Sequence, residues 1–247
     1  MNIASSTPVA LVTGGSRGIG AAISRRLAAD GFAVAINYAG RHQEAEALAT
    51  ELMAKGGQAI ALQADVANPQ SVQSLFDAIE ARFGGVDVVV NSAGVLELAS
   101  LAESEDTLFD RLIAINLKGA FNVLRESARR VRDGGRIVTL STSVVGFKLE
   151  RYGVYAASKA AVETMSAILS KELRGRGITV NAVAPGPTAT SLFLEGKSAE
   201  LIDRLAKMSP LERLGTPDDI AAAVAFLAGA DGGWINGQVL RANGGAV

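Results

Sequence analysis

The sequence predicts an α/β protein with one parallel sheet of about seven strands and helices on both faces of that sheet. Short apolar segments alternate with longer, helix-like segments along all 247 residues, and such alternation is typical of a parallel sheet with crossover helices. Residues 86–90 are apolar enough for a strand that is buried on both faces. No linker, low-complexity tract or repeat divides the chain, so we expect a single domain over residues 1–247.

Turn-forming residues mark the ends of the predicted elements. Glycines at 31, 56–57 and 84–85 follow helix-like segments, and Asn68-Pro69 opens another helix. The predicted strands are residues 8–13, 32–37, 58–63, 86–90, 136–140, 178–183 and 237–241. The predicted helices are residues 21–30, 43–55, 69–83, 106–130, 155–174 and 218–227.

The composition excludes several classes of function. The chain has no cysteine, so it has no disulfides, no thiolate nucleophile and no cysteine-ligated zinc. Its single histidine cannot form a multi-histidine site, and we predict no metal. A net charge of −1 offers no basic surface for nucleic acid or a membrane. The first eight residues lack the features of a secretory signal, so we expect a cytoplasmic protein.

A glycine-rich turn joins the first predicted strand to the first predicted helix. Its sequence is Gly14-Gly15-Ser16-Arg17-Gly18-Ile19-Gly20, with the spacing G-x-x-x-G-x-G instead of the usual G-x-G-x-x-G. Glycines let the backbone approach a pyrophosphate, and the helix N-terminus supplies N–H donors and positive potential. A tight turn without a ligand is the alternative, but the strand-turn-helix context favours dinucleotide binding.

The end of the second predicted strand indicates which dinucleotide is preferred. Asn37 stands where folds that prefer NAD usually carry an acid, and no acid follows until Glu44. Arg17 and Arg41 lie close in sequence, and both suit a 2′-phosphate. We therefore predict a preference for NADP(H), with NAD(H) possible and two merely solvated arginines as the alternative. His42 is expected at the surface, with a contact near the cofactor as its alternative role.

Other candidate ligands follow the apolar strands, where open parallel sheets collect their ligands. Asp65, followed by Val66, is placed to accept a hydrogen bond from an adenine amino group, or else to cap a turn. Small residues after the fourth strand leave room for a ligand, and a proline-glycine turn breaks the sixth. These segments contain the candidates Asn91, Ala93, Gly94, Pro185, Gly186, Thr188 and Thr190. Residues 188–214 are expected to form a mobile substrate lid, or an ordinary covering segment.

Four polar residues in the middle of the chain are the candidates for chemistry. Tyr155 and Lys159 are four residues apart in an alanine-rich helix and should share one face. A nearby cation would lower the phenol pKa from about 10 toward neutrality. Ser143, on the loop after strand 136–140, could hydrogen-bond a substrate oxygen. Asn116, on an apolar helix face, is either a buried structural amide or part of a relay.

Taken in order, these motifs resemble the short-chain dehydrogenase/reductase family in its single-domain branch, over nearly the whole chain. Within this family, the sequence most resembles the 3-oxoacyl-acyl-carrier-protein reductases. The motifs are Thr13-Gly14-x-x-x-Gly18-x-Gly20, Asp65-Val66, Asn91-x-Ala93-Gly94, Asn116, Ser143, Tyr155-x-x-x-Lys159, Pro185-Gly186 and Thr190. The resemblance implies a Rossmann-type, doubly wound sheet.

The resemblance also implies roles for individual residues. Tyr155 would be the general acid in reduction and the base in oxidation, while Lys159 would lower its pKa and bind the nicotinamide ribose. Ser143 would orient the substrate carbonyl, and Asn116 would hold a relay water. Thr190 and the backbone at Thr188 would hold the nicotinamide carboxamide. Three features depart from the family pattern: Ser92, Asn243 and the bulky, charged segment 147–151.

We therefore expect an NADPH-dependent reductase of a ketone or 3-oxoacyl carbonyl. The resemblance implies a homotetramer packed through helices 106–130 and 155–174. An acyl carrier protein could dock at Arg129 and Arg130, although helix-end solubility also explains these arginines. The alternatives are an NAD-linked alcohol or sugar dehydrogenase, a sugar-nucleotide epimerase or dehydratase, and a catalytically silent NADP-binding regulator. The short C-terminal region counts against the epimerase, and the intact polar residues count against the silent regulator.

Overall fold

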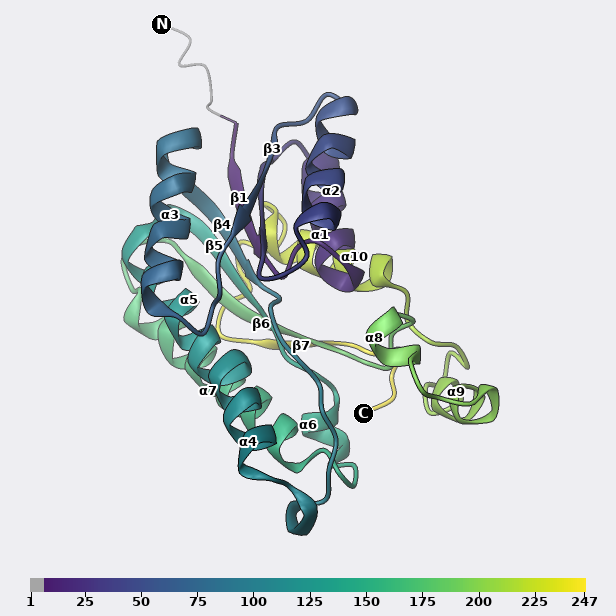
Figure 1. The fold of residues 1–247 in the computed structure, drawn as a ribbon. Coiled ribbons are helices and arrows are strands. Elements are labelled where there is room, and N and C mark those ends of the chain that lie inside the picture. Colours follow the sequence, from purple (N-terminus) through teal and green to yellow (C-terminus); the bar gives the residue numbers. More distant parts are fainter. Residues whose placement is uncertain (1–6) are drawn as a thin grey trace, which may run out of the picture.

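Seven strands form one parallel sheet in the order β3-β2-β1-β4-β5-β6-β7, as a computed structural model shows over residues 7–247 (Figure 1). The strands are β1 (Val9–Thr13), β2 (Ala33–Tyr38), β3 (Ala59–Gln63), β4 (Val86–Asn91), β5 (Val131–Leu140), β6 (Thr179–Pro185) and β7 (Val239–Ala242). The predicted fold class is confirmed. Most of the segment considered for a secretory signal, residues 1–6, lies outside the described residues.

Helices cover both faces of this sheet (Figure 1). They are α1 (Gly18–Ala29), α2 (His42–Ala54), α3 (Pro69–Phe83), α4 (Asp106–Leu112), α5 (Ala120–Arg130), α6 (Val144–Phe147), α7 (Gly153–Glu172), α8 (Ser191–Leu194), α9 (Ala199–Ala206) and α10 (Pro217–Ala228). One hydrophobic cluster packs α1, α2 and α10 on the first face, and a second packs α3, α5 and α7 on the other. Among residues 7–247, none of the helices has the length and apolar character needed to cross a bilayer.

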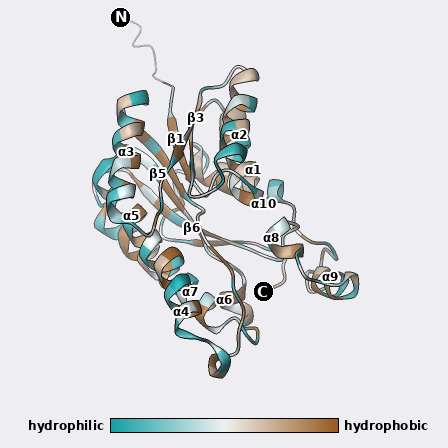
Figure 2. Cartoon of the chain, in the orientation of Figure 1, coloured by the Kyte–Doolittle hydropathy of each residue, from teal (hydrophilic) through white to brown (hydrophobic). Residues whose placement is uncertain are grey.

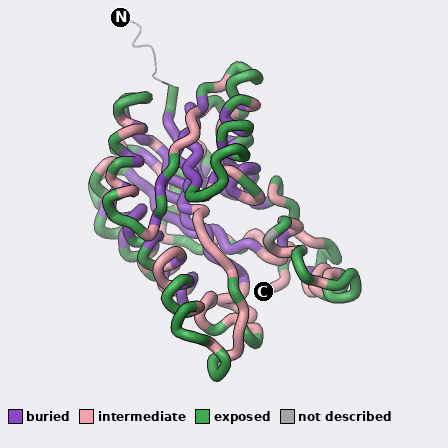
Figure 3. The backbone as a smooth tube through the Cα atoms, in the orientation of Figure 1, coloured by how far each residue is buried: buried purple, intermediate pink, exposed green. Residues whose placement is uncertain are grey.

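The central strands supply side chains to both hydrophobic clusters. In β1, Val9 and Leu11 face one cluster, and Ala10 and Val12 face the other, because successive side chains of a strand point to opposite faces. Figure 2 shows hydrophobic residues along the strands, and Figure 3 shows the same strands buried beneath helices whose outer sides are exposed. The central strands are therefore buried on both faces, as is typical of a parallel sheet.

The register of the central strands brings the motif loops to one edge of the sheet. Thr13 at the end of β1 is paired with Asn91 at the end of β4, and Asn91 is paired with Thr139 of β5. Strand order reverses between β1 and β4, because β2 and β3 extend to one side and β4 to β7 to the other. A crevice at such a switch point is where open α/β sheets bind their ligands.

Two predicted elements differ from those observed. The expected single helix over residues 106–130 has a π-helical segment, Ile113–Gly119, between α4 and α5. The strand predicted to begin at residue 136 begins at Val131, because it continues through two glycines with a shift in register opposite Val86 and Val88. Both differences are local irregularities that hydrophobic periodicity does not reveal.

Candidate active site

A cavity of about 390 Å³ lies at the carboxyl ends of the central strands, within the usual range for a small-molecule site. Most of the residues predicted from the sequence line it. These are Gly14, Ser16, Arg17, Gly18, Ile19, Gly20, Asn37, Arg41, Asp65, Val66, Ala93, Gly94, Ser143, Tyr155, Lys159, Pro185, Gly186, Thr188 and Thr190. Asn91 and Asn116 do not line the cavity, and both are buried beside it.

The glycine-rich turn is shaped by close backbone contacts. Gly14 (φ +61°) packs so closely that a Cβ there would lie 2.9 Å from Ala93 Cα. A Cβ at Gly20 would lie 2.1 Å from the carbonyl oxygen of Gly14. Helix α1 starts at Gly18, and its N-cap residue, Arg17, makes no side-chain capping bond. The first N–H groups of a helix have no partner within the helix, and the first-turn residues Gly18, Ile19 and Gly20 line the cavity, as an anion site requires.

A threonine that we assigned no role joins this turn to the neighbouring loop. The Thr13 hydroxyl donates to Asn91 Oδ1 at 3.0 Å and accepts from the N–H groups of Ser92 and Ala93, both at 3.1 Å. The Asn91 side chain is thus occupied inside the sheet. The contact between Asn91 and the cofactor stays a prediction, and the structure shows only that its carboxamide oxygen is bonded behind the cavity wall.

Asn37 has a similar internal function. Its Nδ2 donates to the carbonyl oxygens of Leu62, at 3.3 Å, and Ala64, at 3.0 Å, and its Oδ1 accepts from Gly14 N at 3.4 Å. The side chain is almost fully buried. Asn37 therefore ties the glycine turn to the ends of β2 and β3 while it forms part of the cavity wall.

Two arginines provide positive charge at the same end of the cavity. Arg17 and Arg41 both line it, and both lower the pKa of Glu44, Arg41 through a direct hydrogen bond and Arg17 only through a weaker charge effect. Arg41 binds Glu44 at 3.0 Å on the surface. Asp65 is exposed, and its Oδ1 accepts from Ala67 N at 2.9 Å, which supports its role as a turn cap. His42 is at the surface, where its Nδ1 lies 2.7 Å from the Tyr38 hydroxyl.

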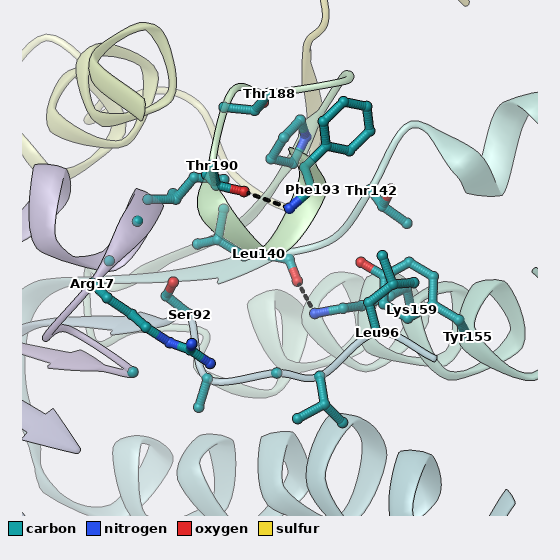
Figure 4. Close-up of a pocket in the computed structure, with 18 of the residues that line it drawn as sticks. Arg17, Ser92, Leu96, Leu140, Thr142, Tyr155, Lys159, Thr188, Thr190 and Phe193 are labelled. Carbon is teal, nitrogen blue, oxygen red and sulfur yellow. Dashed lines mark hydrogen bonds between the residues drawn. The ribbon is translucent and has the colours of Figure 1, made fainter. Parts of the chain in front are cut away.

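Tyr155 and Lys159 project from the first turns of α7 into the cavity wall (Figure 4). The Lys159 ammonium donates to the carbonyl oxygen of Leu140, at 2.8 Å, and burial lowers its pKa to about 8. Gly94 packs against it, since a Cβ there would lie 3.4 Å from Lys159 Nζ. Both residues thus line the cavity, with the lysine ammonium directed to the end of β5.

The pKa of Tyr155 differs from the prediction. Burial raises it to about 12, and the nearby hydroxyl of Thr142 only partly opposes that rise. The prediction of a lowered pKa is wrong for this arrangement, because loss of solvation outweighs any effect of the lysine. The phenol therefore holds its proton throughout the neutral range.

Ser143 lies at the start of α6 and is almost fully buried. Its hydroxyl donates to the Ala184 carbonyl oxygen at 3.1 Å and accepts from Asn243 Nδ2 at 2.9 Å. The contact with Asn243 spans 100 residues, so no local pattern could have revealed it.

Asn116 lies in the π-helical segment with both amide atoms bonded to Val95. Its Oδ1 accepts from Val95 N at 2.8 Å, and its Nδ2 donates to Val95 O at 2.9 Å. This arrangement supports the structural role that the sequence left open. The relay water assigned to Asn116 stays a prediction.

Segment 188–214, which contains α8 and α9 (Figure 1), forms part of the cavity wall, and Thr188, Thr190 and Phe193 are labelled there in Figure 4. Thr188, Thr190, Phe193, Leu205 and Met208 line the cavity. Thr190 caps α8 by accepting from Phe193 N at 3.1 Å.

Comparison with known proteins agrees with this geometry. A family model described as "Enoyl-(Acyl carrier protein) reductase" matches residues 14–247. A "Short-chain type dehydrogenase/reductase" of Picea abies is 47% identical over 97% of this chain and 92% of its own length. The chain belongs to the short-chain dehydrogenase/reductase family. It is therefore an oxidoreductase.

Further members of the short-chain dehydrogenase/reductase family carry more specific names. A protein of Arabidopsis thaliana named "NADPH-dependent aldehyde reductase-like protein, chloroplastic" is 46% identical over 97% of this chain and 94% of its own length. A solved short chain dehydrogenase from Burkholderia cenocepacia J2315, in complex with NADP, is 40% identical with a TM-score of 0.92 and covers 98% of both chains.

Proposed function

We propose that the protein is an NADPH-dependent reductase that transfers hydride to a ketone or 3-oxoacyl-type carbonyl, reversibly, with Tyr155 as general acid and base. The observation that carries this proposal is the single cavity onto which the glycine turn, the arginine pair and Tyr155, Lys159 and Ser143 all open. A related NAD-linked alcohol or sugar dehydrogenase is the alternative, and the cofactor measurements below separate the two.

The residues present fit a dinucleotide phosphate. The tight contact at Gly14 and the uncapped start of α1 leave backbone N–H groups for a diphosphate, and Arg17 and Arg41 suit a 2′-phosphate. Asp65 keeps one carboxylate oxygen free for the adenine end, and Thr188 and Thr190 suit the nicotinamide end. When bound, the cofactor supplies the hydride. The NADPH-dependent name of the Arabidopsis relative and the NADP in the Burkholderia structure support this preference.

The protonation states favour reduction. A phenol with a pKa of about 12 is protonated at neutral pH, so Tyr155 is ready to donate a proton to a developing alkoxide. Lys159, with a pKa of about 8, is a cation at neutral pH and would stabilise the phenolate that remains. Ser143 would hold the carbonyl oxygen, and any relay water would lie between Lys159 and the π-helical segment.

The substrate end of the cavity is apolar, which favours an uncharged, apolar carbonyl compound. The side chains there are Leu96, Phe147, Leu149, Tyr152, Phe193, Leu205 and Met208. The cationic side chains of the cavity wall belong to the cofactor end and to Lys159. A ligand of this kind would be bound chiefly by burial of apolar surface.

An acyl carrier protein is a less favoured form of the substrate. Arg130 is tied to Asp77 and Glu80, each at 2.6 Å, and its guanidinium lies 5.6 Å from the centre of the Phe76 ring. Arg129 is bound to Glu126 at 2.9 Å. Because both predicted docking residues already have partners, we propose a free small molecule as the substrate.

The decisive experiment is a panel of apolar aldehydes, ketones, 3-oxoacyl thioesters and 2-enoyl thioesters, with NADPH oxidation as the readout and product analysis to separate carbonyl from alkene reduction. We expect alcohol products from the carbonyl compounds. Turnover of the enoyl thioesters alone would contradict the proposal, and no turnover would favour the silent regulator. A carrier-linked 3-oxoacyl substrate that reacts much faster than its short thioester would restore the carrier.

We further propose a cytoplasmic homotetramer with α4–α5 and α7 at its interfaces. Exposed Phe109 and Phe121 on the first of these and Ile168 on the second support such packing. Light scattering of the purified protein tests the assembly, and a monomer would contradict it.

A further inference from the structure

The hydroxyl of Ser143 has a fixed set of hydrogen-bond partners. A serine hydroxyl has one donor and two acceptor positions. The donor is directed to the Ala184 carbonyl oxygen at 3.1 Å, and one acceptor position is filled by Asn243 Nδ2 at 2.9 Å. A substrate carbonyl can only accept, so Ser143 must turn its single proton toward the substrate. The proton is free to turn only if Asn243, the second hydrogen-bond partner, does not accept it.

Asn243 can only donate to the Ser143 oxygen. Asn243 Oδ1 accepts from Gly245 N at 3.0 Å, and Nδ2 donates both to Ser143 Oγ and to Val247 O, the latter at 3.2 Å. A flipped amide would place its oxygen against the carbonyl oxygen of Val247, which cannot donate, and its nitrogen against the N–H group of Gly245, which cannot accept. The amide is therefore oriented by its own tail, and it cannot compete for the serine proton.

The tail that carries Asn243 is packed against the turn after β6 and against α6. A Cβ at Gly186 would lie 2.8 Å from Asn243 Cβ, and a Cβ at Gly146 would lie 2.9 Å from a methyl group of Val247. Gly186 N also donates to Ala242 O at 3.1 Å, and the Ser209 hydroxyl donates to Gly244 O at 2.8 Å. These contacts keep the amide at a fixed distance from Ser143.

We infer that Asn243 is a positioning residue, whose amide N–H keeps the Ser143 hydroxyl available as a donor to the substrate carbonyl oxygen. The inference rests on the proposed function. An N–H donated to the serine oxygen also polarises the hydroxyl and strengthens its own donation. A carboxylate at position 243 would do the reverse, since it would accept the serine proton and withdraw it from the substrate.

The test is the nearly isosteric substitution Asn243→Asp, followed as a pH profile of kcat/KM for carbonyl reduction. At pH 7 to 8 the introduced carboxylate is ionised, and we expect a loss of at least about tenfold. As the pH falls toward 5, a growing fraction of the carboxyl group regains a proton to donate, so the loss should shrink. Asn243→Ala removes the donor without adding an acceptor, and should give a smaller loss with no added ionisation.

Two controls separate positioning from a general effect. Asn236→Asp makes the same chemical change at an exposed site away from the cavity and should leave the profile unchanged. In a Ser143→Ala background, Asn243→Asp should change kcat/KM by less than about twofold, because the hydroxyl it acts on is gone. An equal loss in both backgrounds, or a wild-type pH profile for Asn243→Asp, would overturn the inference.

A stability measurement separates failure of the positioning role of Asn243 from failure of the proposed reductase function. The contact between Asn243 and Ser143 can be measured without any turnover. The measurement compares the urea midpoints of the wild type, Asn243→Asp, Ser143→Ala and the variant that carries both substitutions. Non-additive midpoints together with a wild type that reduces no carbonyl compound would refute both the proposed function and the positioning role, and leave only the contact. Additive midpoints in an active enzyme would refute the positioning role alone.

Discussion

The ammonium of Lys159 donates its hydrogen bond to the carbonyl oxygen of Leu140, at 2.8 Å. This contact anchors the first turns of α7 to the end of β5, so the lysine holds two elements of the site together. Because the ammonium is buried, its pKa is lowered to about 8. A buried ammonium lowers the free energy of unfolding, and the size of this effect should depend on pH.

The cost in stability of the buried Lys159 ammonium should fall as pH rises. Between about pH 8 and 10.5 the unfolded chain holds a proton on Lys159 that the folded protein has released, so the free energy of unfolding should rise with pH in this window. The slope from this group is at most about 1.4 kcal/mol per pH unit. Lys159→Met should remove it. Urea unfolding of both proteins at pH 7.5, 8.5 and 9.5 measures the difference, and a difference independent of pH would contradict the prediction.

Tyr155 changes stability in the opposite direction at higher pH. Its pKa is raised to about 12, so between about pH 10 and 12 the folded protein keeps a proton that the unfolded chain has lost. Stability from this group falls as pH rises through that window. Measurements for Lys159 should therefore stop below pH 10.

Replacing the phenol should separate binding from chemistry. Tyr155→Phe removes the hydroxyl and keeps the ring, so we expect kcat to fall by about 10²–10⁴-fold, the usual contribution of a positioned acid or base. The dissociation constant of NADPH, measured by fluorescence titration, should change little. Turnover close to that of the wild type would show that another group transfers the proton.

Cofactor discrimination should depend on Arg17 and Arg41. We expect wild-type protein to bind NADPH more tightly than NADH, and Arg17→Ala or Arg41→Asp to reduce the ratio by about tenfold or more, as expected for loss of a charged hydrogen bond of about 1.5–3 kcal/mol. Calorimetric titration gives both affinities. Equal affinities in the wild type would refute the 2′-phosphate assignment.

Glu44 supplies a matched test of the same site. It binds Arg41 at 3.0 Å and so competes with a phosphate for the guanidinium. Glu44→Gln should therefore tighten NADPH binding by a few fold and leave NADH unchanged. Weaker NADPH binding would mean that Glu44 orients Arg41 and does not compete for it.

The glycine turn should not tolerate a methyl group at residue 20. A Cβ there would lie 2.1 Å from Gly14 O, and two backbone segments cannot both give way. We expect Gly20→Ala to lose about 1–3 kcal/mol of stability, the usual cost of overpacking, together with most NADPH affinity. Gly40→Ala is the control, because a Cβ there meets nothing within 4 Å, and its melting temperature should match the wild type.

Local patterns were sufficient for most of the strands and helices, and for the loops at the ends of the strands. The glycine turn, Asp65, the Tyr155–Lys159 pair and Ser143 were found because each has a fixed place relative to an apolar strand or a helix. The start of β5 was missed because Gly134 and Gly135 indicated a turn, and the π-helical segment was missed because its apolar pattern is that of a helix.

Contacts between distant segments were out of reach of the sequence. Thr13 bonds to residues 78 to 80 positions further along, and Ser143 to a tail residue 100 positions away. The pKa of Tyr155 was predicted in the wrong direction because burial of the phenol raises it, and burial depends on packing that helical spacing does not show. Helical spacing also does not show that the Lys159 ammonium donates to the carbonyl oxygen of Leu140 at the end of β5.

The strand order also decides when this cavity can form during folding. β1 lies inside the sheet between β2 and β4, yet β4 starts 73 residues after β1 ends (86 − 13), and the wall at Thr188 and Thr190 follows only after β6. Contacts this distant in sequence form slowly, because long loops must close first. A chain emerging from the ribosome therefore exposes its glycine turn long before that turn can hold a nucleotide, and acquisition of the ligand should be among the last events of maturation.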